Sequence, residues 1–412
     1  MEKRQPEVNI GVVGHVDHGK TTLVQALTGM WTMRHSEEIR RGMTIKLGYA
    51  DGEVWVCPGC GYPDMYTPEP VCECKPGETP EFRRRVSFVD APGHEILMAT
   101  MLSGAALMDG ALLVIAANEP CPQPQTREHL AALEIIGAKN IVVVQNKVDV
   151  VSRERAIKNY EEILKFIKGT AAEDSPIIPV SALKRVNIDA LIAGIEERIK
   201  TPERDLSKPP LMYVVRSFDV NKPGTPPERL MGGVLGGSLI QGVLRVGDEL
   251  EIRPGIEVKK VGGKPVYEPI LTRVESLRFG DTPVDEAKPG GLVAVGTSLD
   301  PSLTKADNMV GNVAGKPNQL PPVFDNLTLS YGLFEKIMGL KEEVRVEPPR
   351  RGEQLVLSVG PSLTLGVITN IRKDTMEVNL ARPVVAWKGA RVAISRRVQG
   401  RWRLAGWAVV EA

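Results

Sequence analysis

The chain has 412 residues, more than one hydrophobic core usually organises, so two or three domains are expected. Hydrophobic residues make up 42% and charged residues 25% of the sequence, and no apolar run approaches the ~20 residues that a membrane-spanning helix needs. Lysine and arginine number 52 against 51 aspartates and glutamates, which excludes a global positive field for nucleic acid and leaves room only for a local basic patch.

Residues 1–206 are predicted to form an α/β domain. Apolar, β-branched runs alternate there with helical patterns, beginning with VNIGVVG before TTLVQAL and ending with PIIPVSA before NIDALIAGIEERI. This alternation predicts a doubly wound, mostly parallel sheet. The first ten residues lead into the first strand without an apolar signal segment, from which we expect a cytoplasmic protein.

The segment GHVDHGKT, from Gly14 to Thr21, matches the phosphate-loop pattern and lies between the first predicted strand and helix. Its glycines let the backbone curl so that N–H groups point at a β-phosphate beside a helix N-terminus. A lysine in this place lies between β- and γ-phosphates, and a threonine hydroxyl suits Mg²⁺. The alternative, a glycine-rich turn with a chance lysine, leaves the flanking strand and helix unexplained. The predicted phosphate-binding residues are Asp17, His18, Gly19, Lys20, Thr21, Thr22 and, farther along the chain, Gly93.

The segment RRGMTI at residues 40–45 is the predicted first switch. Thr44 is expected to coordinate Mg²⁺ only while the γ-phosphate is present. A basic turn before a strand is an equally open interpretation of this segment.

Four of the five cysteines lie within 18 residues, as the pairs Cys57-Pro-Gly-Cys60 and Cys72-Glu-Cys74. This spacing predicts four thiolates around one tetrahedral Zn²⁺. Because four cysteines leave no open coordination position, the metal is expected to be structural. The second pair is Cys-x-Cys and not the commoner Cys-x₂-Cys, so a metal-free or partly oxidised loop is the alternative. Cys121 stands apart and is interpreted as an unpaired small residue in a loop.

The segment DAPGH, residues 90–94, follows the predicted strand VSFVD. Asp90 is therefore expected at the carboxyl end of a strand, where it would hold Mg²⁺ through water. Gly93 can offer its N–H to a γ-phosphate, and loss of that phosphate would release the loop. His94 is predicted to be catalytic by orienting the attacking water, and an ordinary loop histidine is the alternative. The predicted Mg²⁺ ligands are thus Thr21, Thr44 and Asp90.

The tetrapeptide NKVD, residues 146–149, ends the predicted strand IVVVQN. An aspartate there can accept hydrogen bonds from guanine N1 and N2, a pattern that adenine cannot supply. Its position after a phosphate loop and an Asp-x-x-Gly motif makes a metabolic ATPase or kinase the weaker alternative. The asparagine is expected to brace neighbouring loops, the lysine stem to lie along the base, and the loop after PIIPV to present an N–H to guanine O6. The predicted guanine-binding residues are Asn146, Lys147, Asp149, Ser181, Ala182 and Leu183.

Beyond the proline-rich stretch TPERDLSKPP, the periodicity changes to short apolar runs punctuated by glycine. Such runs predict β-barrels with tight turns. A second proline-rich stretch, GKPNQLPPVFDN, is expected to separate two barrels. The predicted domains are 1–206, with the cysteine insertion at 55–76, followed by the barrels 207–325 and 326–412.

The set GHVDHGKTT, DAPGH, NKVD and SAL, followed by two glycine-punctuated β-domains, resembles the translational GTPases related to elongation factor Tu over nearly the whole chain. Within that group, RGMTIKLGYAD with the cysteine insertion, and later LDPSLTKADNMVGNVAG, resemble the gamma subunits of archaeal and eukaryotic translation initiation factor 2. The modest length favours the archaeal form. The resemblance implies a GTPase that carries methionylated initiator tRNA to the small ribosomal subunit, with GTP hydrolysis triggering release.

The resemblance also implies partners and residue roles. It implies a heterotrimer in which a beta subunit contacts the nucleotide domain and an alpha subunit contacts the first barrel. Asp17 joins His94 as a predicted catalytic residue, and Val16 and Met43 match two apolar residues that shield the catalytic histidine in relatives. The DAPGH segment replaces the DCPGH of elongation factor Tu without changing a functional group.

The last predicted domain interleaves basic and aromatic residues. Arginine can pair with phosphate and stack on exposed bases, which fits the acceptor end of a tRNA. The same alternation is typical of one edge of a half-buried strand, so both interpretations stay open. The residues concerned are Arg396, Arg397, Arg401, Trp402, Arg403 and Trp407.

Two other functions compete with the initiation carrier. One is an elongation factor Tu-like carrier of other aminoacyl-tRNAs, including selenocysteine delivery. The other is a GTPase subunit of a metabolic enzyme resembling sulfate adenylyltransferase, against which the cysteine insertion and the RGMTIKLGYAD segment argue.

Overall fold

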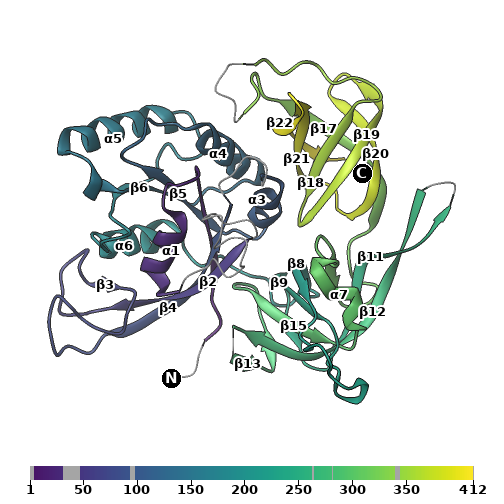
Figure 1. Cartoon of the computed structure of the whole chain (residues 1–412), viewed down its shortest axis with the longest axis horizontal. Coiled ribbons are helices and arrows are strands. Elements are labelled where there is room, and N and C mark those ends of the chain that lie inside the picture. Colours follow the sequence, from purple (N-terminus) through teal and green to yellow (C-terminus); the bar gives the residue numbers. More distant parts are fainter. Residues whose placement is uncertain are drawn as a thin grey trace. The chain divides into compact units, whose positions relative to one another are not determined.

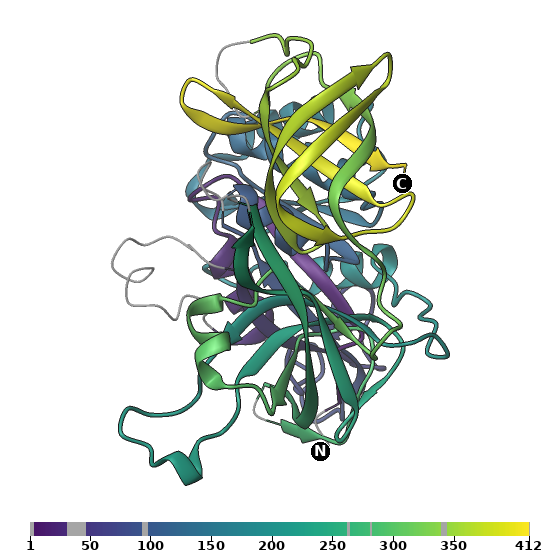
Figure 2. The same cartoon turned by 90° about the vertical axis from the view of Figure 1, so that its right-hand side faces the viewer.

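The computed structural model describes residues 4–30, 47–92, 98–261, 264–280, 282–338 and 344–411. The chain divides into two compact units, one formed mainly by residues 6–202 and the other by residues 203–337 and 344–412 with the first five residues. Figure 1 shows the first unit in purple to blue and the second in green to yellow, and Figure 2 gives the view at right angles. Among the described helices, none is both long enough and apolar enough to cross a membrane.

The first unit contains a seven-stranded sheet in the order β3-β2-β4-β1-β5-β6-β7. The strands from β4 to β7 in that order pair in parallel, whereas β2 pairs antiparallel with β4 and with β3. This arrangement confirms the predicted α/β class. The strands are β1 (Val8–Gly14), β2 (Gly48–Val56), β3 (Tyr66–Thr67), β4 (Glu81–Asp90), β5 (Gly110–Ala116), β6 (Ile141–Asn146) and β7 (Ile177–Pro179).

Helices cover both faces of this sheet, so β1, β5 and β6 are buried along their whole length and are mostly apolar in sequence. Apolar side chains of α1 and α6 form one core with alternate residues of the central strands. On the opposite face, α5 places Asn159 against Gln145 of β6, and α4 packs on β1 and β5. The helices are α1 (Lys20–Thr28), α3 (Met98–Ala105), α4 (Pro124–Ile136), α5 (Arg153–Ile167) and α6 (Ile188–Arg198).

The second unit begins with a barrel in which six strands close through the pairing of β11 with β12. Its core consists of inward-facing aliphatic residues such as Val214, Leu235 and Val295. A short helix, α7 (Pro301–Thr304), and a two-stranded sheet of β10 and β14 accompany it. The strands are β8 (Leu211–Phe218), β9 (Val234–Gln241), β10 (Leu244–Arg245), β11 (Glu249–Val261), β12 (Lys264–Phe279), β13 (Thr282–Val284), β14 (Glu286–Ala287), β15 (Val293–Thr297) and β16 (Val313–Gly315).

The same unit ends with a closed barrel in the order β17-β20-β19-β18-β21-β22. The two barrels touch, since Arg382 donates to the Val310 carbonyl at 3.1 Å and the Ser362 hydroxyl donates to the Gly311 carbonyl. The domain boundary predicted at residue 325 falls two residues inside β17. The strands are β17 (Val323–Leu333), β18 (Gln354–Val359), β19 (Ser362–Arg372), β20 (Thr375–Val385), β21 (Arg391–Val398) and β22 (Arg401–Val410).

Candidate functional site

The turn between β1 and α1 has the tight backbone that a phosphate loop requires. Asp17 and Gly19 adopt left-handed conformations, with φ of 59° and 85°. A Cβ atom at residue 19 would collide with the side-chain nitrogen of Asn146, so only glycine fits there. Because α1 begins at Lys20, the N–H groups of its first turn are available to bind an anion.

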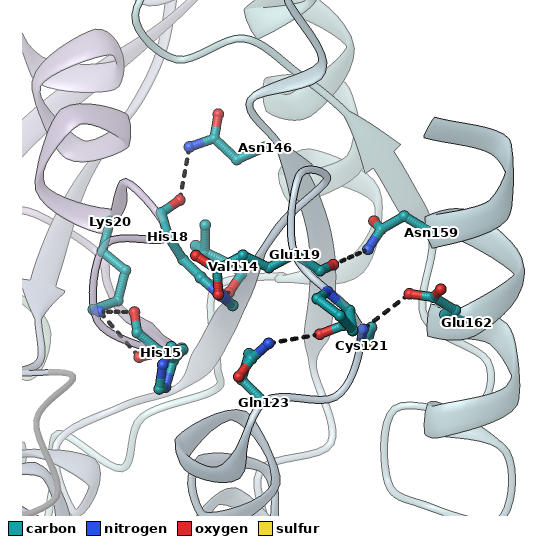
Figure 3. Close-up of polar contacts among 12 residues, drawn as sticks. His15, His18, Lys20, Val114, Glu119, Cys121, Gln123, Asn146, Asn159 and Glu162 are labelled. Atoms are coloured by element: carbon teal, nitrogen blue, oxygen red, sulfur yellow. Dashed lines mark hydrogen bonds and ion pairs between the residues drawn. The ribbon is translucent and has the colours of Figure 1, made fainter. Parts of the chain in front are cut away.

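Lys20 lies inside this loop and is only 7% exposed. Its Nζ donates to the carbonyls of Gly14 at 3.0 Å and His15 at 2.7 Å, as Figure 3 shows. Burial lowers the pKa of Lys20 to about 8, and the carboxylates of Asp90 and Asp17 oppose that shift. Phosphate oxygens are stronger acceptors than these carbonyls, so a bound phosphate can take over the ammonium group.

Two predicted Mg²⁺ ligands lie together. The Thr21 hydroxyl donates to Asp90 Oδ2 at 2.8 Å, although the two residues come from α1 and the end of β4. Hydroxyl and carboxylate oxygens are the hard ligands that Mg²⁺ prefers, so this pair fits the metal. Met43, Thr44, Gly93 and His94 lie outside the described residues.

Asn146, at the end of β6, joins the phosphate loop to the loop after β7. Its Nδ2 donates to the His18 carbonyl at 2.9 Å, and its Oδ1 accepts from the Ala182 N–H at 3.0 Å. The Ser181 N–H donates to the Val186 carbonyl at 3.2 Å. Both amides thus have partners in the structure, and recognition of guanine O6 by this loop stays a prediction.

The remaining guanine-motif residues are accessible. Lys147 adopts a left-handed conformation with φ of 64°, and the 3₁₀ turn Val148–Val150 follows directly. Asp149 within that turn is exposed, and Leu183 on the neighbouring loop is 76% exposed. Asn146 therefore ties together the two loops that carry these groups.

Two buried histidines contact the phosphate loop in ways that motif spacing does not reveal. His129 of α4 accepts the Gly14 N–H on its Nδ1 at 2.8 Å. His18 is 1% exposed, and its Nδ1 is 3.0 Å from the Val114 carbonyl of β5. Helix α4 mixes polar and apolar residues, and nothing in that pattern singled out His129 or indicated its partner.

The four clustered cysteines converge, as their spacing predicts. The Sγ atoms of Cys57, Cys60 and Cys74 lie within 4.8 Å of one another. The sulfurs are paired as the disulfides Cys57–Cys72 and Cys60–Cys74, each joining one pair of the motif to the other. Tetrahedral thiolates around zinc stand about 3.8 Å apart, because each Zn–S bond is ~2.3 Å long. The cluster in its reduced form therefore fits a zinc ion.

Cys121 is the one unpaired cysteine of the described residues. Burial raises the pKa of its thiol to about 12, with a further contribution from Glu162. Its backbone N–H donates to Glu162 Oε2 at 2.9 Å. The thiol is thus protonated at neutral pH, in agreement with the interpretation of Cys121 as an ordinary loop residue.

The basic and aromatic residues of the last domain lie on the paired strands β21 and β22. Arg396 forms an ion pair with Glu353 at 2.5 Å, and Arg403 is 5% exposed. Arg397, Arg401 and Trp407 are exposed. Part of the pattern therefore belongs to the barrel itself, and three of its side chains face solvent.

Three family models match the chain. The elongation factor Tu GTP binding domain matches residues 5–201, elongation factor Tu domain 2 matches residues 232–313, and the C-terminal domain of initiation factor eIF2 gamma matches residues 325–410. These matches follow the order of the α/β domain and the two barrels.

Full-length relatives carry one name, translation initiation factor 2 subunit gamma. The Aeropyrum pernix protein is 72% identical over 410 residues, which is 100% of this chain and 99% of the relative. The Sulfurisphaera tokodaii protein is 62% identical, over 99% of this chain and 98% of the relative.

Solved structures show the same fold. A bacterial selenocysteine-specific elongation factor, EF-Sec, has a TM-score of 0.74 and 25% identity over 98% of this chain, which spans only 58% of that factor's length. Elongation factor SelB from Methanococcus maripaludis, in complex with a GTP analogue, has a TM-score of 0.72 and 22% identity, over 100% of this chain and 80% of its own. The chain therefore belongs to the gamma subunits of translation initiation factor 2, and it is a translational GTPase of the elongation factor Tu family.

Proposed function

We propose that this protein carries methionylated initiator tRNA to the small ribosomal subunit in the cytoplasm, as the core of a heterotrimer with alpha and beta subunits. The observation that supports this proposal most directly is the 72% identity to a translation initiation factor 2 gamma subunit across the whole chain. GTP holds the carrier in its binding state, and hydrolysis releases the tRNA.

The nucleotide site senses the γ-phosphate. Lys20 and the amides of residues 17–22 bind the phosphates, while Thr21, Asp90 and Thr44 hold Mg²⁺, which neutralises phosphate charge. Asn146, Lys147, Asp149 and the loop of residues 181–183 select guanine. Gly93 contacts the γ-phosphate, so hydrolysis frees its loop.

His94 orients the attacking water, assisted by Asp17, and Val16 and Met43 shield it until the ribosome acts. A His94→Ala variant should bind GTP nearly as well as the wild type but lose ribosome-stimulated turnover. Turnover at the wild-type rate would refute the role.

Exposed apolar side chains support a protein partner on each unit. On α5, Ile157, Tyr160 and Leu164 are 51%, 37% and 46% exposed at spacings that share one helix face. We assign this face to the beta subunit. On the first barrel, Leu230 and Met231 are 47% and 58% exposed, and we assign their loop to the alpha subunit.

The cysteine insertion completes the proposed function as a structural element. Cys57, Cys60, Cys72 and Cys74 bind one zinc ion through four thiolates. The insertion is built largely of turns, and the metal supplies the stability that a hydrophobic core would otherwise provide.

Filter binding with GTP or GDP tests the carrier role. We expect specific retention of methionylated initiator tRNA with GTP, weaker retention with GDP, and little retention of elongator aminoacyl-tRNAs. Equal retention of elongator tRNAs would indicate an elongation factor, and no preference over bulk tRNA would indicate a metabolic GTPase.

Arg401→Ala, which removes an exposed arginine of the β21–β22 hairpin, tests the tRNA surface. It should weaken tRNA retention several-fold, whereas the matched change Arg372→Ala at the exposed end of β19 should not. GTP affinity should be the same in both variants.

A further inference from the structure

Strand β19 turns its larger aliphatic side chains outward, away from the core of the last barrel. Leu363, Leu365 and Val367 are 39%, 45% and 37% exposed, and they share one face because they stand at every second position. A half-buried strand normally points apolar side chains inward and polar ones outward. The inward positions of β19 are instead occupied by Ser362, Thr364, Gly366 and Ile368.

Interactions within the barrel fix this register. The Thr364 hydroxyl donates to the Arg382 carbonyl at 2.8 Å and accepts from the Arg382 N–H at 3.1 Å. A Cβ atom at Gly366 would collide with the side chain of Val378, so a larger residue does not fit there. A slip by one residue would bury the leucines but would break both of these contacts. The outward row is therefore a fixed feature of the barrel.

The neighbouring strand β18 extends the apolar surface (Figure 1). Val356 stands directly opposite Leu365, so the two side chains lie on the same face of the barrel. Every residue of both strands is described, and none of the outward-facing ones at residues 354–358 and 363–369 is charged. A contiguous apolar surface of this kind is typical of an interaction site, whereas a single exposed leucine is not. We call Val356, Leu363, Leu365 and Val367 the β19 face.

Basic side chains border one end of the β19 face. The Gly352 N–H donates to the Ile368 carbonyl at 2.8 Å, which places the turn before β18 beside the end of the row. The turn after β19 lies at the same end. The exposed basic residues of these two turns are Arg350, Arg351, Arg372 and Lys373. Glu347 lies 2.8 Å from Arg350, and Glu377 lies 3.9 Å from Arg372.

The whole domain carries the same sign of charge. Residues 326–412 contain 14 lysines and arginines against 8 aspartates and glutamates, a net charge of +6, whereas the net charge of the entire chain is +1. A partner with complementary charge is therefore acidic. A second copy of this domain would bring like charges together, which disfavours self-association through this face.

We propose that the β19 face binds an amphipathic helix of a partner protein, with aliphatic side chains on one side and acidic residues beside them. The barrel is closed and offers no strand edge, so side chains must make the contact. From Leu363 to Val367 the row spans ~13 Å, the length of about two to three helical turns. The face lacks the aromatic and basic side chains that hold RNA bases. It lies on a different domain from the surfaces assigned to the alpha and beta subunits.

The test uses the full chain and three fluorescein-labelled peptides of about 16 residues, whose binding is followed by fluorescence anisotropy. The first peptide repeats leucine at i, i+3, i+4 and i+7, with glutamate and alanine elsewhere. The second has lysine in place of glutamate, and the third has serine in place of leucine. We expect micromolar binding of the first, at least about tenfold weaker binding of the second, and no binding of the third.

Leu365→Asp should weaken binding of the first peptide at least about tenfold, because it places a charge in the centre of the face. Leu271→Asp is the matched control, since Leu271 is a 69% exposed leucine on β12 of the other barrel, and it should bind like the wild type. Thermal unfolding checks the fold. If the aspartate variant is destabilised, Leu365→Ser replaces it, with binding at least about three-fold weaker.

No binding of the acidic leucine peptide, or equal binding by the wild type and Leu365→Asp, would overturn the proposal. A loss of tRNA retention in Leu365→Asp would also overturn it, because the face would then belong to an RNA surface. A wild-type dimer that Leu365→Asp dissociates, measured by analytical ultracentrifugation, would assign the face to a second copy of the chain and overturn the proposal as well.

Discussion

The phosphate loop and the cysteine insertion belong to the same unit, but different interactions hold them in place. Lys20, His18 and Asn146 are buried, and each contacts backbone groups that the parallel sheet positions. The insertion lies at the sheet edge beyond β2 and contains only the two-residue strand β3, so sulfur atoms replace a core. A segment with a rigid frame can thus orient polar groups precisely, whereas a segment without one needs cross-links or a metal.

One ion pair links the insertion to the loop after β7, which Asn146 connects to the phosphate loop. Arg185, on the loop that follows β7, contacts Glu69 of the insertion at 2.6 Å. Both side chains are about half exposed, at 49% and 54%, and such pairs contribute only about 0–1 kcal/mol. We therefore expect changes in the cysteine insertion to have little effect on nucleotide binding at the phosphate loop.

Removing the buried ammonium group should have the largest effect. Lys20→Ala should weaken GTP binding by about 100-fold, because it deletes charge-assisted hydrogen bonds worth about 1.5–3 kcal/mol each. Isothermal titration calorimetry gives the affinity, with the exposed Lys139→Ala as the control. A loss below about three-fold would show that the loop amides alone carry the phosphate.

The pH dependence of binding should follow from the same group. The pKa of Lys20 is lowered to about 8 in the free protein, and bound phosphate raises it because the anion favours the charged form. GTP affinity should be flat below pH 8 and fall by up to about tenfold per pH unit above it, until the pKa of the bound state is reached. In the Lys20→Ala variant, GTP affinity should no longer decrease above pH 8. An unchanged pH dependence in that variant would show that another group titrates.

Disrupting the cysteine cluster should destabilise the insertion and leave nucleotide binding nearly unchanged. Cys60→Ser should abolish zinc binding, measured by metal analysis of the purified protein, and make residues 57–74 sensitive to protease. GTP affinity should change by no more than about two-fold. A loss of GTP affinity comparable to that of Lys20→Ala would show that the two regions are not independent. Cys121→Ser, outside the cluster, is the control.

The smallest effect is expected from the ion pair itself. Arg185→Ala should change GDP affinity by less than about three-fold. The same Arg185→Ala change is then made in the Cys60→Ser background. If the insertion acts through the Arg185–Glu69 pair, the change in GDP affinity should be smaller there than in the wild-type background, and if it does not, the two changes should be equal. The double-mutant cycle therefore measures how strongly the two regions are coupled.

Local patterns were sufficient for the elements and for the motif residues. The glycine spacing around Lys20, the apolar runs of β1, β5 and β6, and the cysteine pairs all depend on near neighbours in the chain, which is why they could be interpreted without a structure. Contacts made by residues outside the recognised motifs could not be predicted in this way. His129 and Gly14 are far apart in sequence, and nothing in either segment indicates their contact.

In the last barrel, too, the local sequence left open what only the fold decided. Alternating arginine and tryptophan residues were consistent with RNA binding and with a strand edge, and only the fold placed Glu353 beside Arg396 and buried Arg403 while leaving Arg401 exposed. The sequence by itself determined the α/β class, the β-rich remainder and the identity of the nucleotide motifs, because these follow from short periodicities and backbone requirements. Tertiary structure alone decided which polar groups are buried together around the phosphate loop, because burial and pairing depend on segments that only folding brings into contact.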